Sequence, residues 1–354
     1  MVDEIWDRNE NAIVIFEHLA DNSEEKVLAD YGILLWGNMN GNYGEAAMGY
    51  NENNKSDMSW GVYSNRNWNE PNLVTYMESH DEERLTYKCI QFGKTEGNYS
   101  VKQLPVALDR MALNSAFLIP LPGPKMIWQF GERGYDQSIN SFGGRLNEKP
   151  PLWEYLDDEK RLELFNTVAK LNFLKQTYEE FVPQVFTSNL AGDIKWYKLN
   201  TGSNHVFVVG NFSTHEIIAS VSFSVMGQWF EYFSKTTFDV DVPPQNLTLA
   251  PGEFRLYSTR QFEDPHIKTD TKTIQITELG FVIYPNPASD KIYIESETPF
   301  NEICIYSVRG KKVLTNKYNS ERKTNLDMNG FLPGLYIIRI SQKNKVFTQK
   351  LIIR

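Results

Sequence analysis

The sequence predicts an α/β region followed by two all-β domains, and three observations support this fold class. Residues 1–182 alternate short apolar runs with helical patterns, which is typical of a parallel sheet built from β-then-α units. Residues 183–260 alternate apolar and polar side chains between turn residues, which predicts an antiparallel β-sandwich. A polar and charged stretch, 261–273, is a predicted linker before a second short β-domain, 274–354, which we expect to be a small β-sandwich.

Four buried strands are predicted within residues 1–182. Each is a short apolar run followed by a loop rich in Gly, Asn or acidic residues, and the runs are Ile13–Glu17, Ile33–Trp36, Leu73–Met77 and Lys125–Phe130. Helices are predicted from Asp21, which has capping-box spacing to Glu24, to Gly32; from Ser100 to Phe117; and from Asp157 or Asp158 to about Leu174. Four such units form half of a closed eight-stranded barrel. Its open edges and apolar interior should make it a poor folder alone.

Two of the predicted strands end on a carboxylate beside an imidazole. Glu17 and His18 close the first strand, and His80 and Asp81 follow the third. Parallel strands of a barrel end on one face, so we expect these side chains to share one rim. Cleaving or forming a glycosidic bond needs two carboxyl groups facing each other across the sugar. The pattern therefore favours a carbohydrate-active site that contains Glu17 and Asp81.

The motif Ser79-His80-Asp81-Glu82 resembles the fourth conserved region of the α-amylase superfamily, glycoside hydrolase family 13, and is closest to its form in 1,4-α-glucan branching enzymes. Three further stretches follow in the order that this family has along its barrel, namely Leu35-Trp36-Gly37-Asn38, residues 121–127 and residues 130–136. The resemblance covers residues 1–182 and implies the second half of a (β/α)8 TIM barrel, strands five to eight. Residues 183–260 resemble the all-β domain that follows this barrel.

The resemblance assigns roles to individual residues. It implies that Glu17 is the general acid/base, that Asp81 stabilises the transition state, and that His80 donates a hydrogen bond to the sugar. The family's nucleophile is another aspartate, with an arginine two residues before it at the end of barrel strand four, and nothing between Met1 and Glu17 matches that motif. We therefore expect an N-terminally truncated chain without a nucleophile, inactive when expressed alone.

Other candidate residues have weaker support. Trp36 is a candidate sugar-stacking ring, and His18 is either a further substrate-binding residue or a packing histidine. Gly143-Gly144-Arg145 is either a substrate loop with a guanidinium donor or an ordinary turn. The five scattered histidines and the acidic residues near Asp81 do not have metal-ligand spacing, so neither a metal nor another cofactor is expected.

The C-terminal region carries a second resemblance. Four stretches of residues 274–354 resemble the C-terminal sorting domain of the type IX (Por) secretion system: Tyr284-Pro285-Asn286-Pro287, residues 308–313, residues 332–338 and residues 350–354. The resemblance implies the secretion machinery as a partner and a secreted or cell-surface location. Residues 1–4 do not have the features of a signal peptide, which adds to the expectation that the natural N-terminus is missing.

Composition excludes some classes of function. The net charge of −9 and the pI near 5.3 argue against a nucleic-acid partner, and no apolar run has the length of a membrane-spanning helix. Cys89 and Cys304 fall in different predicted domains, so no disulfide framework is inferred. The sequence thus predicts an α-amylase or a 1,4-α-glucan branching enzyme that acts on α-1,4-glucan polysaccharide by a retaining mechanism. The alternative is a non-catalytic, surface-displayed glucan-binding protein.

Overall fold

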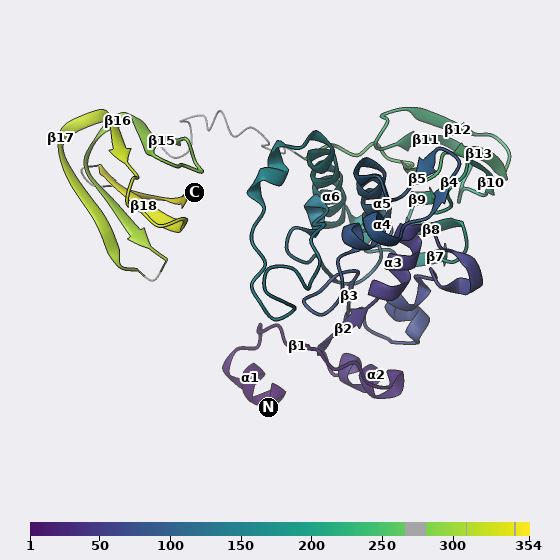
Figure 1. Cartoon of the computed structure of the whole chain (residues 1–354). Helices are drawn as coiled ribbons and strands as arrows, with labels where there is room; N and C mark the ends of the chain where they lie inside the picture. The colour runs from purple at the N-terminus through teal and green to yellow at the C-terminus, as the bar shows by residue number, and fades with distance from the viewer. Residues whose placement is uncertain (266–280, 309, 343–344) are drawn as a thin grey trace. The chain divides into compact units, whose positions relative to one another are not determined.

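The computed structural model describes residues 1–265 and 281–354 apart from 309 and 343–344, and it divides into two compact units, Met1–Ile267 and Lys268–Arg354 (Figure 1). The division falls inside the predicted linker. Residues 266–273 of that linker and the first seven residues of the predicted last domain, 274–280, lie outside the described residues.

The first unit begins with a parallel sheet of four short strands in the order β1-β2-β3-β6. These strands are β1 (Ile15–Phe16), β2 (Leu34–Asn38), β3 (Leu73–Tyr76) and β6 (Lys125–Met126). All three pairings are parallel, and β3, in the interior of the sheet, is buried at every position. The partial α/β barrel predicted from the four apolar runs is confirmed; β1, β3 and β6 are shorter than predicted, whereas β2 begins one residue later and ends two residues later.

Six α-helices accompany this sheet within the described residues. They are α1 (Val2–Arg8), α2 (Asn22–Asp30), α3 (Asn40–Met48), α4 (Leu85–Phe92), α5 (Leu104–Ala116) and α6 (Glu159–Thr177). Short 3-10 turns lie at η1 (Glu52–Asn54), η2 (Ser59–Gly61), η3 (Tyr63–Arg66), η4 (Gly131–Arg133), η5 (Trp153–Asp157) and η6 (Glu179–Phe181), and a small hairpin pairs β4 (Thr95–Glu96) with β5 (Tyr99–Ser100).

One predicted helix start is confirmed without its predicted capping box, and another was wrong. Asp21 is the N-cap of α2, but its side chain makes no capping bond, and the Glu24 carboxylate pairs with His18 Nε2 at 2.8 Å. The N-cap of α5 is Gln103, because Ser100 lies in the hairpin strand β5. The predicted start of α6 at Asp158 is confirmed, since this carboxylate accepts a hydrogen bond from the backbone N–H three residues later, at 3.0 Å.

An antiparallel β-sandwich completes the first unit. Its larger sheet has the order β12-β11-β14-β9-β8-β7, and β10 pairs with β13 in a second sheet. The strands are β7 (Val185–Asn189), β8 (Ile194–Thr201), β9 (Asn204–Asn211), β10 (Ile217–Val221), β11 (Gly227–Glu231), β12 (Thr237–Val240), β13 (Gln245–Leu249) and β14 (Phe254–Ser258). Side chains of both sheets, among them Trp229 and Leu249, form one buried cluster between them.

The α/β part and the sandwich share a hydrophobic core. Phe117, at the end of α5, packs edge-on against Tyr197 of β8 and Phe212 after β9, with ring centroids 5.4 and 5.0 Å apart. All three rings are fully buried in one cluster that contains residues of both parts. Residues 1–265 are therefore held together by apolar packing across the predicted domain boundary at 182/183.

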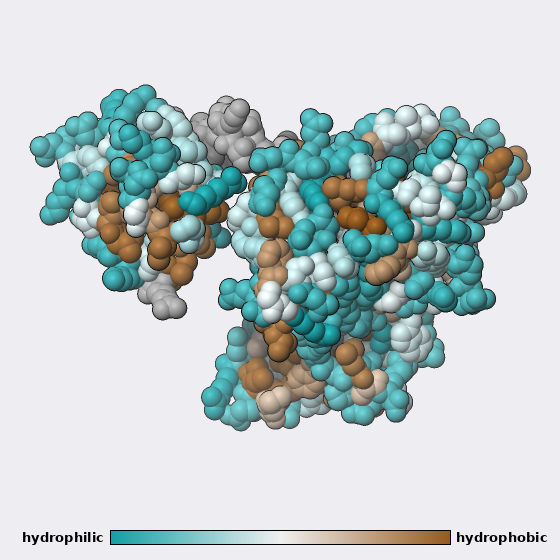
Figure 2. Space-filling model, in the orientation of Figure 1, coloured by the Kyte–Doolittle hydropathy of each residue, from teal (hydrophilic) through white to brown (hydrophobic). Residues whose placement is uncertain are grey.

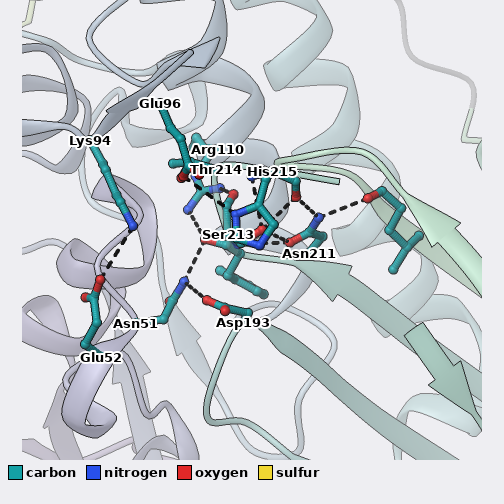
Figure 3. Close-up of polar contacts among 12 residues, drawn as sticks. Asn51, Glu52, Lys94, Glu96, Arg110, Asp193, Asn211, Ser213, Thr214 and His215 are labelled. Carbon is teal, nitrogen blue, oxygen red and sulfur yellow. Dashed lines mark hydrogen bonds and ion pairs between the residues drawn. The ribbon is translucent and has the colours of Figure 1, made fainter. Parts of the chain in front are cut away.

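A buried guanidinium reinforces this junction (Figure 3). Arg110 of α5 donates to the carbonyls of Ala46 and Ala47 at the end of α3, and to those of Phe212 and Ser213 in the sandwich, at 2.5 to 2.9 Å. Next to it, Asn51 donates to the carboxylate of Asp193 at 2.8 Å. Burial of Arg110 without a contacting carboxylate lowers the pKa of its guanidinium, and its hydrogen bonds go to backbone carbonyls.

The second unit is an antiparallel β half-barrel. Its five strands are β15 (Phe281–Tyr284), β16 (Lys291–Ser307), β17 (Lys312–Asp327), β18 (Gly334–Gln342) and β19 (Lys345–Ile353). The two long strands β16 and β17 pair with register shifts after Glu295, and both halves of β16 contribute to one buried core, for example Ile292 and Phe300. The predicted small C-terminal β-domain is therefore confirmed.

Apolar surface remains near the N-terminal edge of the parallel sheet. Within the described residues, β1 pairs only with β2, and Ile13, Ile15 and Leu19 around it are exposed by 78%, 45% and 54%. Figure 2 shows brown, apolar patches over the part of the unit that holds α1 and α2. The predicted open edge of the half-barrel is thus present.

Candidate active site

The ends of β1 and β3 bring three of the predicted side chains together. Glu17 directly follows β1, and His80 and Asp81 follow β3 after three residues. One ligand atom of each of the three lies within 4.8 Å of the others. His80 Nε2 is 3.9 Å from Glu17 Oε1 and 3.7 Å from Asp81 Oδ1. The imidazole therefore stands between the two carboxylates, and all three groups face solvent.

Aromatic rings surround His80. The ring of Trp36, in β2 between β1 and β3, packs edge-on at a centroid distance of 5.8 Å, and the ring of Trp128 lies at a centroid distance of 6.0 Å. Tyr76, at the end of β3, packs edge-on against Trp36 at 5.3 Å. Burial, together with the negative charges of Glu82 and Glu17, raises the pKa of the Tyr76 hydroxyl, so it stays protonated beside the acidic group.

Asp81 borders a pocket of about 310 Å³. Its lining includes His80, Trp128, Tyr135, Gln137 and Ser138, together with a loop of residues 145–149. Glu17 is not among the described residues that line it, although it lies beside His80. The pocket is therefore bordered directly by Asp81 and His80, while Glu17 approaches from the β1 side.

Arg145 on that loop contacts Asp81. Its Nη2 donates to Asp81 Oδ1 at 2.8 Å. This hydrogen bond lowers the pKa of the Asp81 carboxyl, and the neighbouring His80 imidazole makes a smaller electrostatic contribution. The Asp81 carboxyl therefore stays ionised down to a lower pH than an isolated aspartate.

Buried contacts fix the segment that carries His80 and Asp81. Glu78, 2% exposed, accepts a hydrogen bond from the backbone N–H of Leu85 at 2.7 Å and lies 3.4 Å from the Arg84 guanidinium. Gly131 passes so close that a Cβ there would lie 2.7 Å from Glu78 Oε2. Glu82 accepts hydrogen bonds from Asn38 and Ser79. The segment is therefore anchored on both sides of His80.

The predicted site residues do not all join this group. Trp36 does, through His80, whereas His18 pairs with Glu24 on α2 and does not approach Asp81 in any described contact. Among the described residues, Glu17, His80 and Asp81 are the set that could hold a metal ion, because they offer two carboxylates and one imidazole.

Arg145 and Trp128 also enter the site, although neither was among the residues selected from the sequence as site residues. The Gly143-Gly144-Arg145 motif had two interpretations, a substrate loop with a guanidinium donor and an ordinary turn. Both glycines have left-handed φ values, +92° and +119°, which supports a turn that also delivers the arginine to Asp81. Nothing local to Trp128 distinguishes it from the other tryptophans.

Solved structures of α-amylases match this chain. An α-amylase from Geobacillus thermoleovorans in complex with acarbose is 14% identical at a TM-score of 0.55, over 73% of this chain and 56% of its own. An Anoxybacillus α-amylase is 15% identical at 0.51, over 74% and 55%. The cyclomaltodextrin glucanotransferase CldA is 15% identical at 0.57, over 73% and 52%.

This chain has the α-amylase fold. At this level of identity the likeness establishes the fold alone, and the chain spans only 52 to 56% of the length of these three structures. The predicted fold class is confirmed: a partial barrel, then an antiparallel sandwich. No curated protein sequence matches the chain.

The C-terminal unit has a separate match. Residues 282–354 match the family model described as secretion system C-terminal sorting domain. This domain directs the protein to secretion or the cell surface, as the C-terminal motifs predict. Among the helices of the described residues, none combines the length and apolar character needed to cross a bilayer.

Proposed function

We propose that this protein is a glycosidase or transglycosidase of the α-amylase superfamily that acts on α-1,4-linked glucans by a retaining mechanism. The convergence of Glu17, His80 and Asp81 at the strand ends of a sheet with the α-amylase fold carries the proposal. Structurally similar amylases were solved with acarbose, maltose or maltotriose, which supports an α-glucan ligand class for this site.

Each of the three groups has a chemical role in this proposal. Glu17 protonates the leaving glycosidic oxygen and later takes the proton of the incoming acceptor. Asp81, kept ionised by Arg145, stabilises the positive charge that develops on the sugar ring, and His80 donates a hydrogen bond to a sugar hydroxyl. The retaining class is what the resemblance to the α-amylase superfamily implies, and it requires a nucleophilic carboxylate in addition to Glu17 and Asp81.

Two acceptors of the transferred glycosyl group are compatible with the proposal. Water as acceptor makes the protein an α-amylase, and a second glucan chain makes it a 1,4-α-glucan branching enzyme. The motif Ser79-His80-Asp81-Glu82 favours branching, whereas the segment after Glu17 departs from typical branching enzymes. The fold supports neither over the other, because both hydrolases and a glucanotransferase share it.

A second candidate function is glucan binding without catalysis, on a protein displayed at the cell surface. One observation favours it. The group of Glu17, His80 and Asp81 holds two carboxylates, and neither of them has the role of nucleophile in the mechanism proposed above. A retaining reaction also needs that nucleophilic carboxylate. We therefore expect the 354-residue chain to release no reducing sugar from starch and to form no branches.

The test is binding of maltotriose to the complete chain by isothermal titration calorimetry. We expect binding that His80→Ala and Asp81→Ala weaken about tenfold or more, because each removes a charge-assisted hydrogen bond to the sugar. His18→Ala is the matched control and should bind like the unchanged chain. Absence of binding, or equal affinity in all variants, would contradict the proposal.

Turnover separates the two candidates. If the chain or a longer form of it cleaves or branches starch, Glu17→Gln should lower kcat by about 10²- to 10⁴-fold, the usual contribution of a general acid/base. A normal rate in that variant would remove Glu17 from the mechanism. Binding without turnover in every form would favour the non-catalytic candidate.

A further inference from the structure

A second hollow lies beside the candidate site, between α3 and α4, which pack side by side (Figure 1). It is an open groove of about 860 Å³, and we call it the α3–α4 groove. Its lining includes Glu45, Tyr50, Tyr87, Gln91, Phe92 and Ser138. The groove is larger and shallower than the pocket at Asp81.

Three aromatic side chains line this groove without another ring as partner. Phe92 is 59% exposed, and Tyr50 and Tyr87 are half-buried. In the part of the chain that the structure describes, none of the three stacks on another aromatic ring. The Tyr50 hydroxyl donates to the Phe92 carbonyl at 3.0 Å, which holds the two residues next to each other. Exposed rings among polar groups are typical of a ligand-binding surface.

The charges along the groove favour an uncharged ligand. Glu45 and Glu83 face Lys55, Lys88 and Lys102, so neither sign dominates. The Lys88 ammonium is already used, since it donates to Asn40 Oδ1 at 2.5 Å. The Glu83 carboxylate also has partners, because Ser138 and Ile139 donate hydrogen bonds to it. Rings, amides and balanced charges suit the apolar faces and hydroxyl rims of sugar units.

The α3–α4 groove adjoins the pocket of the candidate active site. Ser138 lines both hollows. Its hydroxyl donates to Glu83 at 2.8 Å, and the backbone N–H of Ile139, which lines the pocket, donates to the same carboxylate at 2.7 Å. This shared rim is therefore held by two hydrogen bonds, and the two hollows adjoin at it.

We propose that one α-1,4-glucan chain occupies both hollows: its reacting glucose unit lies at Asp81, and further glucose units of the same chain bind in the α3–α4 groove. The inference rests on the proposed function, and it adds that the site selects long linear glucans over short ones. Stacking on Phe92 and Tyr87 supplies the additional affinity, since each ring offers an apolar face next to hydrogen-bonding side chains.

The experiment compares maltotriose and maltoheptaose, both titrated into the complete chain. Maltotriose is short enough for the pocket alone, whereas maltoheptaose reaches into the groove. We expect maltoheptaose to bind more tightly than maltotriose. Phe92→Ala and Tyr87→Ala should weaken only maltoheptaose, by about fivefold to tenfold, as expected for one lost aromatic contact.

Tyr31→Ala is the matched control, because Tyr31 is similarly exposed, at 56%, and lines neither hollow. It should change neither affinity. Equal affinity of the unchanged chain for both sugars would contradict the proposed role of the groove. So would an equal loss of affinity for both sugars in the Phe92 and Tyr87 variants. If His80→Ala still weakens maltotriose binding in that case, the proposed function stands and only the proposal for the groove is contradicted. If neither sugar binds to the unchanged chain, both proposals are contradicted.

Discussion

Asp81 has two basic neighbours, Arg145 at 2.8 Å and His80 at 3.7 Å. The lowered pKa of the Asp81 carboxyl comes mainly from the Arg145 hydrogen bond. The pair is exposed to solvent, so its effect is on protonation of the site and contributes little to folding. A sugar that displaces Arg145 would have to replace this hydrogen bond.

Arg145→Gln is therefore expected to raise the pKa of the Asp81 carboxyl towards its ordinary range. A carboxyl with a lowered pKa stays ionised down to a lower pH, so its protonation midpoint should move to a higher pH once the guanidinium is lost. Carbon-13 NMR of the aspartate carboxyl groups measures this midpoint. Arg8→Gln, which removes an exposed arginine paired with Glu4, is the control. An unmoved midpoint would show that Arg145 does not set the charge of Asp81.

Gly131 is the second residue on which the site geometry depends. Gly131→Ala places a Cβ 2.7 Å from the Glu78 carboxylate, which is buried and held by the Leu85 N–H, so backbone must shift. We expect a loss of about 1–3 kcal/mol in the free energy of unfolding, with weaker maltotriose binding. Urea unfolding followed by tryptophan fluorescence measures the first. Gly41→Ala, in α3 with open space around its Cβ, should be neutral or stabilising.

Among the elements, strands were predictable and several helices were not. Buried parallel strands are continuous apolar runs, so all four were found from local pattern. Helix α3 was missed because its sequence contains two glycines and has little helical preference of its own. Tertiary contacts stabilise it instead: the Tyr43 hydroxyl donates to the Phe117 carbonyl at 2.6 Å, and Asn114 donates to the Tyr43 carbonyl at 3.0 Å. Such contacts between distant residues leave no local signal.

The same distinction applies to the candidate site. Glu17, His80 and Asp81 were proposed from strand ends, because their position follows from the direction of parallel strands. The contact of Arg145 with Asp81 spans 64 residues and depends on how a long loop folds back, so the local motif could not decide between a substrate loop and an ordinary turn. His18 was proposed on proximity to Glu17 alone, and Glu24 one helical turn into α2 offers it a nearer partner.

Strand β8 contains a buried cation that should make folding depend on pH. Lys195 is fully buried and donates to Ser56 Oγ at 3.0 Å and to the Gly192 carbonyl at 2.7 Å. Burial lowers the pKa of its ammonium group to about 7. Between that value and the ordinary lysine value near 10.5, the unfolded chain binds the extra proton. The contribution of Lys195 to stability therefore rises as the pH rises through this window.

Lys195→Met should accordingly stabilise the first unit at pH 6, by up to a few kcal/mol, and the gain should shrink as the pH approaches 10. Below pH 7 the unchanged chain buries a charged ammonium, whereas the methionine carries no charge at any pH. Urea unfolding at pH 6, 8 and 10 gives the comparison. Lys26→Met on exposed α2 is the control and should leave the slope with pH unchanged. A pH-independent difference would contradict the assignment.

At the scale of the whole molecule, Arg110 couples the α/β part to the sandwich. Arg110→Met removes four hydrogen bonds to buried carbonyls, and in the described part of the chain only those of Ala46 and Phe212 have a second donor, from the Gly49 N–H and the Asn51 amide. We therefore expect a loss of about 3 kcal/mol or more in the free energy of unfolding. The loss should appear in one cooperative transition, since both parts share a core. Arg8→Met, in an exposed helix, is the control. Two separate transitions, or an unchanged midpoint, would contradict the coupling.

The two compact units have separate cores, and this predicts separate unfolding. All eight tryptophans precede residue 268, so tryptophan fluorescence reports only on the first unit. Phe300→Ala empties a fully buried position of the sorting domain and should cost that unit about 3–5 kcal/mol, without moving the fluorescence transition. Hydrogen exchange of peptides from β16 and β18 follows the second unit.

The matched variant is Phe117→Ala, which removes an equally buried ring that joins α5 to the sandwich. It should lower the fluorescence transition by a similar amount, because deletion of a buried ring removes apolar contact and leaves a cavity. Exchange in β16 and β18 should then stay as it is in the unchanged chain. If either variant destabilises both units together, the cores are energetically coupled and the sorting domain does not fold as a unit of its own.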